Sequence, residues 1–187
     1  SISSNQLFFN MNRLLLIIFM LLGIRCFTIA QAVDNKIDSF RAGTDILISV
    51  DRPLIIQSKR PTVLVLYALP NGNSTAQTMG KKMQEGDDWH FDIQHIRAQT
   101  AFIRREWKKT NLIVVYLEND YRSWPAWKQK HPDFKKKIPK LVDSLTTHIG
   151  GKGCQVYLNG HSGGGSFIFG YLAGVQKIPS FIKRISF

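Results

Sequence analysis

The chain has 187 residues, 44% of them hydrophobic and 20% charged, which is an ordinary composition for one globular domain with a sizeable core. No internal repeat, low-complexity tract or nucleic-acid-binding motif occurs, so we expect no nucleic-acid partner. The formal net charge is +12. The basic residues are scattered, which is typical of a solvated surface and is also compatible with attraction to anionic surfaces or polymers.

An export pattern occupies the N-terminal part of the chain. A short positive segment around Arg13 precedes an apolar run over residues 14–22, and Ala-Gln-Ala at 30–32 fits the small-x-small cleavage pattern. The run is shorter than the roughly 20 residues that a membrane span needs. We therefore expect 11–32 to be a signal peptide and 1–10 to be non-structural upstream sequence. The mature protein would be secreted or periplasmic, without a stable membrane span; an uncleaved N-terminal anchor is the alternative.

The two cysteines predict no internal disulfide. Cys26 would be removed with the signal peptide, which leaves Cys154 as the only cysteine of the mature chain, residues 33–187. Its place at a predicted strand suggests a small buried hydrophobe.

The first elements of the mature chain are predicted to be strands. Residues 33–43 are polar and irregular and suggest a linker. Residues 45–57 alternate apolar and polar side chains around Asp-Arg-Pro at 51–53, which suggests a hairpin. Residues 62–69 form a continuous apolar run, as expected of a strand buried on both faces. The turn signal Pro-Asn-Gly-Asn at 70–73 ends it.

Helices and strands alternate after this turn. A polar stretch leads to residues 92–107, where apolar side chains follow helical spacing and Asp92 is a candidate N-cap. Residues 112–117 form a second buried strand, followed by a loop rich in aromatic side chains. The aromatic residues of this loop are Tyr121, Trp124 and Trp127.

The alternation continues to the last residues. An apolar stripe predicts a helix over 138–149, with Pro139 in its first turn, where the missing N–H costs nothing. A third buried strand at 156–158 is followed by a helix over 163–174. A further strand begins at 182–187. The order predicts an α/β fold, a mostly parallel sheet with helices on both faces.

One motif indicates a candidate catalytic residue. The segment Asn-Gly-His-Ser-Gly-Gly-Gly contains G-x-S-x-G at Gly160, Ser162 and Gly164, between a predicted strand and a predicted helix. This is the context of a nucleophile elbow, a tight turn that exposes the serine Oγ above the sheet. The flanking glycines leave room for the turn. The backbone N–H of Gly163 would point at a developing oxyanion, and His161 completes the elbow.

The stretch from about residue 62 to residue 187 resembles the first half of an α/β-hydrolase core of the secreted serine esterase type. The resemblance implies a second oxyanion N–H near Asn71 or Gly72, although Pro-Asn-Gly stands here where the family commonly has His-Gly. It also implies the chain order serine, acid, histidine. Residues 163–187 contain no Asp, Glu or His. We therefore expect the hydrolase domain to be truncated after the strand that follows the nucleophile helix.

Several polar and aromatic residues allow two roles each. His161 suggests a packing or supporting group beside the serine. Glu118 and Asp120 end a strand and would either contact substrate or cap helices and pair at the surface. The aromatic loop would either bind a sugar or aryl group or form a small satellite core. A metal site at His90 and His95 is not expected.

These observations predict a serine hydrolase without a cofactor. Ser162 would attack a carboxylic ester, either a small molecule or one linked to a polymer, and form an acyl-enzyme. Without a downstream acid and histidine, the chain would be inactive alone. The alternative is a non-catalytic secreted protein on the same fold that binds a ligand or glycan through the aromatic loop.

Overall fold

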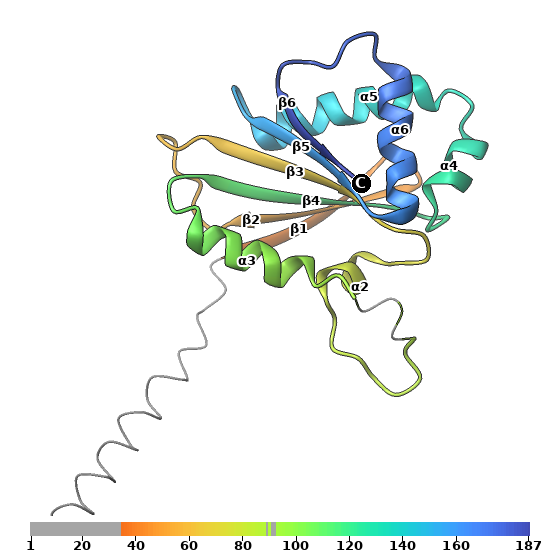
Figure 1. Ribbon diagram of the computed structural model, residues 1–187, viewed down its shortest axis with the longest axis horizontal. Coiled ribbons are helices and arrows are strands. Elements are labelled where there is room, and N and C mark those ends of the chain that lie inside the picture. Colours follow the sequence, from red (N-terminus) through yellow and green to blue (C-terminus); the bar gives the residue numbers. More distant parts are fainter. Residues whose placement is uncertain (1–34, 89, 91–92) are drawn as a thin grey trace, which may run out of the picture. The chain divides into compact units, whose positions relative to one another are not determined.

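A six-stranded sheet with helices on both faces forms the part of the chain that the computed structural model describes, residues 35–88, 90 and 93–187 (Figure 1). The proposed signal peptide, the upstream residues 1–10 and the candidate N-cap Asp92 lie outside the described residues. The α/β class and the mostly parallel sheet expected from the sequence are confirmed.

The strands lie in the order β1-β2-β4-β3-β5-β6. β4, β3, β5 and β6 are parallel to one another, whereas β2 is antiparallel to both β1 and β4. The strands are β1 (Asn35–Ala42), β2 (Ile46–Pro53), β3 (Thr62–Ala68), β4 (Asn111–Asn119), β5 (Gln155–Gly160) and β6 (Ile182–Ser186). The helices are α2 (Thr75–Met79), α3 (Ile96–Glu106), α4 (Trp124–Lys130), α5 (Phe134–Leu145) and α6 (Gly165–Gly174).

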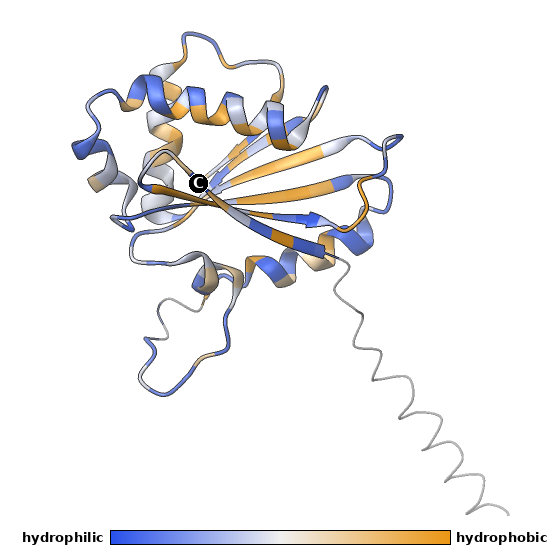
Figure 2. Ribbon diagram, turned by 180° about the vertical axis from the view of Figure 1, so that it is seen from behind, coloured by the Kyte–Doolittle hydropathy of each residue, from blue (hydrophilic) through white to orange (hydrophobic). Residues whose placement is uncertain are grey.

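The two faces of the sheet carry separate hydrophobic cores. On one face, side chains such as Leu64, Val115 and Leu158 pack against α4, α5 and α6. On the other, Leu112 and Tyr116 belong to a smaller cluster with α2 and α3. Figure 2 shows the central strands as hydrophobic along most of their length, as expected of strands covered on both sides. No helix among the described residues is long and apolar enough to cross a bilayer.

The N-terminal hairpin differs from the prediction. Residues 35–42, expected to be part of a linker, form β1, and the turn lies at Gly43 rather than at 51–53. Gly43 has a φ of +69°, which favours glycine, and this makes the turn possible. The prediction failed because β1 is an edge strand whose residues are at most partly buried, so its sequence lacks the apolar run of a central strand.

The helices also differ from the prediction in detail. The polar stretch after β3 contains α2, where Ser74 and Gln77 form a capping box. Pro139 lies inside α5, not in its first turn. It therefore cannot donate to the carbonyl of Lys135, and Gly174 of α6 approaches this carbonyl closely. The helical segment that follows α5 ends at Gly150, and Gly151 after it has a φ of +75°.

A buried ion pair joins α3 to the sheet. The Asp51 side chain is fully buried, and its Oδ1 accepts hydrogen bonds from Arg104 Nη1 at 2.7 Å and Asn35 Nδ2 at 2.8 Å. Arg104 also donates to the carbonyls of Asp51 and Leu112. Burial, together with the charge of Asp51, raises the pKa of the nearby Tyr116. The adjacent guanidinium and the amide donor stabilise this buried charge through Oδ1, whereas Oδ2 is buried without a hydrogen-bond partner among the described residues.

We predict that Arg104→Met lowers the free energy of unfolding by about 3–5 kcal/mol, because it leaves the Asp51 carboxylate buried without its cation. Urea unfolding followed by circular dichroism measures this. Arg105→Met is the matched control: Arg105 lies over the exposed ring of Phe102, so its loss costs about 1 kcal/mol or less. Equal losses for the two variants would contradict the assigned role of Arg104.

Candidate active site at the carboxyl edge of the sheet

Ser162 lies in a strained turn between β5 and α6. His161 is extended, and Ser162 begins a short 3-10 turn, Ser162–Gly164, that leads directly into the helix. Ser162 has a φ of +52°, a left-handed conformation that costs a residue with a side chain about 1–2 kcal/mol. Its side chain is exposed, and its Oγ makes no hydrogen bond with the residues that the structure describes. The strained serine backbone expected from the motif is therefore confirmed.

The glycines of the motif are required by close packing. A Cβ on Gly160 would lie 2.6 Å from the carbonyl carbon of Gly164. A Cβ on Gly164 would collide with the carbonyl oxygen of Ala68 at the end of β3, and one on Gly163 with the side chain of Asn71. The turn can pass this close to the neighbouring strand only because these positions lack side chains.

The loop after β3 lies beside the serine because β3 and β5 are paired, with Ala68 opposite Gly160. The structure distinguishes Asn71 from Gly72, the two residues expected to supply the second oxyanion N–H. The N–H of Gly72 donates to the carbonyl of Arg122 at 2.8 Å and is therefore occupied. The N–H groups of Asn71 and Gly163 have no acceptor among the described residues. Two unpaired donors thus lie on either side of the elbow.

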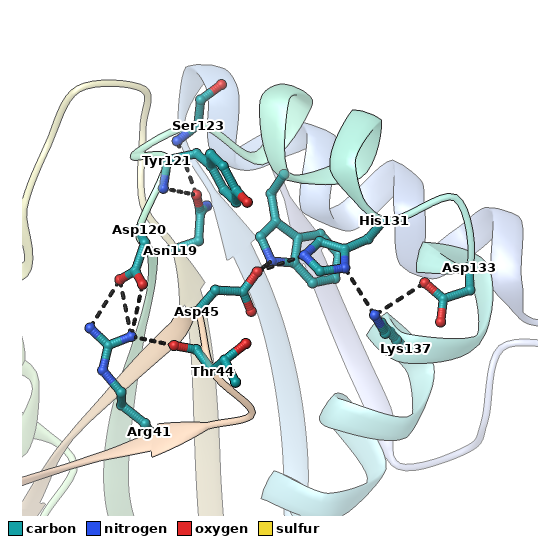
Figure 3. A network of polar contacts seen from close by, with 11 residues as sticks. Arg41, Thr44, Asp45, Asn119, Asp120, Tyr121, Ser123, His131, Asp133 and Lys137 are labelled. Atoms are coloured by element: carbon teal, nitrogen blue, oxygen red, sulfur yellow. Dashed lines mark hydrogen bonds and ion pairs between the residues drawn. The ribbon is translucent and has the colours of Figure 1, made fainter.

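A second strained turn, which no sequence pattern indicated, holds this loop in place. Arg122, whose carbonyl accepts from Gly72, has a φ of +46°. The buried side chain of Asn119 shapes the turn, because its Oδ1 accepts from the N–H of Tyr121 at 3.1 Å and of Ser123 at 3.3 Å (Figure 3). Asn119 ends β4, and the loops after β3 and β4 are therefore fastened together.

His131 and Asp45 form a histidine–carboxylate pair at the same edge of the sheet, but both side chains are already engaged in hydrogen bonds. His131 Nε2 and Asp45 Oδ2 are 2.6 Å apart, and Trp127 Nε1 donates to the same oxygen at 2.9 Å (Figure 3). Lys137 Nζ lies 2.9 Å from His131 Nδ1. Because an ammonium can only donate, His131 accepts at Nδ1 and donates from Nε2. Neither ring nitrogen is free to take a proton from Ser162.

The structure contradicts the expectation that Tyr121, Trp124 and Trp127 together form a substrate-binding loop. Trp124 and Trp127 belong to the helix α4, which Ser123 caps, and are only 1% and 2% exposed. Trp124 packs against Phe167 of α6 with ring centroids 4.7 Å apart. Only Tyr121, 45% exposed, remains able to contact a ligand. The tryptophans belong to the main hydrophobic core and not to a small satellite core, and they are not available for stacking on a sugar.

The structure also shows the surroundings of three polar residues near the candidate site, His161, Glu118 and Asp120. His161 is exposed, so the expected packing role is wrong. Glu118 caps α2 by accepting hydrogen bonds from the N–H and the hydroxyl of Thr75, both at 2.7 Å. Asp120 pairs with Arg41 at the surface. Both carboxylates therefore have structural roles.

The described residues include neither a metal site nor a reactive thiol that would compete with Ser162. Among the described residues, no group of three His, Cys, Asp or Glu side chains is placed to hold a metal ion. Cys154 is buried, as expected, and burial raises the pKa of its thiol. A raised pKa keeps this sulfur protonated and unreactive at neutral pH. Ser162 is the exposed nucleophile of the candidate site.

The arrangement can bind an oxyanion but does not by itself activate the serine. It supplies an exposed hydroxyl and the N–H of Gly163 at the start of a helix, where the dipole also favours negative charge, and the N–H of Asn71 in the adjacent loop. No base among the described residues is hydrogen-bonded to Ser162 Oγ, and the ring of the neighbouring His161 is exposed. Comparison with known proteins adds nothing further, since no protein family, curated protein or solved structure matches the chain.

We predict that Ser162→Gly raises the free energy of unfolding by about 0.5–1 kcal/mol. Glycine relieves a backbone strain of about 1–2 kcal/mol, which exceeds the roughly 0.4–1 kcal/mol that its freedom in the unfolded chain removes. Urea unfolding measures the change. Ser162→Ala keeps the Cβ and should leave stability near that of the parent chain, and a gain as large as that of glycine would show that the serine backbone is not strained.

Proposed function

We propose that the protein is a serine hydrolase of the α/β-hydrolase type that cleaves carboxylic esters through an acyl-enzyme on Ser162. The observation that carries the proposal is the left-handed Ser162 between a parallel strand and a helix, flanked by glycines that contact the neighbouring strand. A Gly/Ser turn that only connects a strand to a helix has no need of a strained serine at its most exposed position.

The loop after β3 supports the same proposal. In α/β-hydrolases the oxyanion hole combines the N–H of the residue after the nucleophile with an N–H from the loop after the third strand. Here those positions are Gly163 and the loop of Asn71 and Gly72. Since the Gly72 N–H is occupied, we assign the second donor to Asn71.

The reaction follows from these assignments. Ser162 Oγ attacks the ester carbonyl carbon while its proton passes to a histidine, and the N–H groups of Gly163 and Asn71 stabilise the oxyanion. The protonated histidine then gives that proton to the leaving alcohol. Water, deprotonated by the same histidine, hydrolyses the acyl-enzyme and regenerates the serine.

The histidine and the carboxylate that orients it are not among residues 163–187, where the order serine, acid, histidine would place them. His131 does not replace them, because both its ring nitrogens are engaged. We propose that both groups are supplied from outside this stretch. If the export signal is functional, the enzyme acts outside the cytoplasm on small or polymer-linked esters.

We predict that protein expressed from the complete reading frame hydrolyses p-nitrophenyl acetate, and that Ser162→Ala lowers kcat about 10⁴-fold or more, because no other group forms the acyl-enzyme. Cys154→Ser is the control and should leave kcat unchanged, since the thiol is buried. Full activity of the Ser162→Ala variant would refute the assignment.

The 187-residue chain on its own should show no Ser162-dependent turnover of the same ester, because no base among the described residues is hydrogen-bonded to the serine. The measurement compares it with its Ser162→Ala variant at equal concentration. A difference between the two would mean that a base among the described residues reaches Ser162, and would contradict the inference that the histidine comes from elsewhere.

A further inference from the structure

The loops at the edge of the sheet opposite Ser162 contain basic residues but no acidic ones. The strands β3, β4, β5 and β6 are parallel, so the loops that lead into them gather at the amino edge (Figure 1). These loops cover 54–61, 107–110, 150–154 and 175–181, and none of them contains Asp or Glu. Their cationic residues are Lys59, Arg60, Lys108, Lys109, Lys152 and Lys177.

These cations form no ion pair with a carboxylate among the described residues, a property that they share with other surface cations such as Lys135 and Lys136. Arg41, Lys81 and Lys137 are all paired with aspartates. Lys108 and Lys109, by contrast, are exposed and form no ion pair within the described part of the chain. Their charge is therefore available to an external anion. Glu106, at the end of α3, is the one acidic neighbour that lines the same hollow.

Large apolar side chains are exposed beside these cations. Leu54, Ile55 and Ile56 are consecutive and 60%, 75% and 43% exposed, and Trp107 is 41% exposed. In Figure 2 the loop after β2 is coloured as hydrophobic although it belongs to no core. Single exposed apolar residues are common, but a contiguous run of this size indicates an interaction surface.

The buried side chain of Asn111 holds the two main loops together. Its Nδ2 donates to the carbonyls of Gln57 at 2.9 Å and Arg60 at 3.2 Å, and its Oδ1 accepts from the N–H of Gln57. Asn111 directly follows the loop that carries Trp107, Lys108 and Lys109. Pro61, Trp107, Lys108 and Lys109 also line one open hollow of about 590 Å³. The apolar and basic groups thus form one surface, held in place by a side chain that is 3% exposed.

We propose that this surface, the amino-edge patch of Leu54, Ile55, Ile56, Lys59, Arg60, Trp107, Lys108 and Lys109, docks the protein on a bilayer that contains anionic lipids. Aliphatic side chains and a tryptophan enter the interface, where an amphipathic ring is favoured, and the cations contact the headgroups. An anionic polymer would account for the lysines, but it gives no reason for three consecutive exposed aliphatic residues.

The first test is co-sedimentation of the full chain with vesicles of phosphatidylcholine alone and with 30% phosphatidylserine. We expect binding to the anionic vesicles that weakens with salt and is much lower on phosphatidylcholine. Lys108→Gln with Lys109→Gln should lower the partition coefficient about 25-fold, roughly fivefold for each lysine. Residues 14–22 are apolar and present in every variant, so their contribution cancels in the ratio.

Matched variants elsewhere on the surface isolate the patch. Lys135→Gln with Lys136→Gln makes the same change of charge on α5, at exposed lysines without an ion pair in the described residues, and should alter partition less than twofold. Ile55→Ala should weaken binding, whereas Phe102→Ala, at a similarly exposed position of α3, should not. Glu106→Gln should strengthen it. Equal effects of the two lysine pairs would overturn the proposal.

A second readout reports insertion rather than charge. With Trp89 replaced by Phe in every variant, brominated lipids should quench tryptophan fluorescence of the bound chain, and Trp107→Phe should remove much of this quenching, since Trp124 and Trp127 are buried. Binding that is equally strong on heparin, with no loss of quenching in Trp107→Phe, would mean that the patch recognises soluble polyanions, and the lipid proposal would fail. Failure of either test would leave the hydrolase proposal intact, because Ser162 lies at the other edge.

Discussion

The parallel pairing of β3 with β5 is the constraint on which the candidate site depends. It places Ala68 opposite Gly160, so the carbonyl of Ala68 meets Gly164 and the loop after β3 runs beside the serine. A larger residue at Gly164 would push the elbow away from the strand. The approach of the loop after β3 to the elbow and the need for glycine at position 164 are therefore consequences of one strand pairing.

Polar groups that the fold buries serve to fix loops and helices. Asp51 and Arg104 attach α3 to the sheet, Asn119 shapes the turn that holds the loop after β3, and His131 with Asp45 fastens α4 to the hairpin turn. Such pairs gain little stability over apolar packing, but each specifies one arrangement, since a displaced partner would leave a buried charge or amide unsatisfied. The geometry around Ser162 is thus set by several polar contacts that lie outside the motif.

The central part of the fold could be predicted from the sequence because its strands are buried on both faces. The apolar runs at 62–69 and 112–117 and the glycine-flanked Ser162 have few alternative explanations. The edge strand β1 could not be predicted, since it lacks a buried face. The sequence left burial of Trp124 and Trp127 as one of two alternatives, because it depends on how α4 packs on α6. The engagement of Gly72 by Arg122 was equally hidden, because it joins loops that are 50 residues apart.

The seven-residue length of β3 has a consequence for any substrate. At about 3.3 Å per residue, this strand separates the amino-edge patch from the elbow by roughly 23 Å. A protein held on a bilayer by one edge would therefore carry its serine at a fixed standoff from the lipid, facing the surrounding water. Ester groups of the lipids themselves would be out of reach. Groups on polymers or molecules that extend a few nanometres from the membrane would be the ones within range.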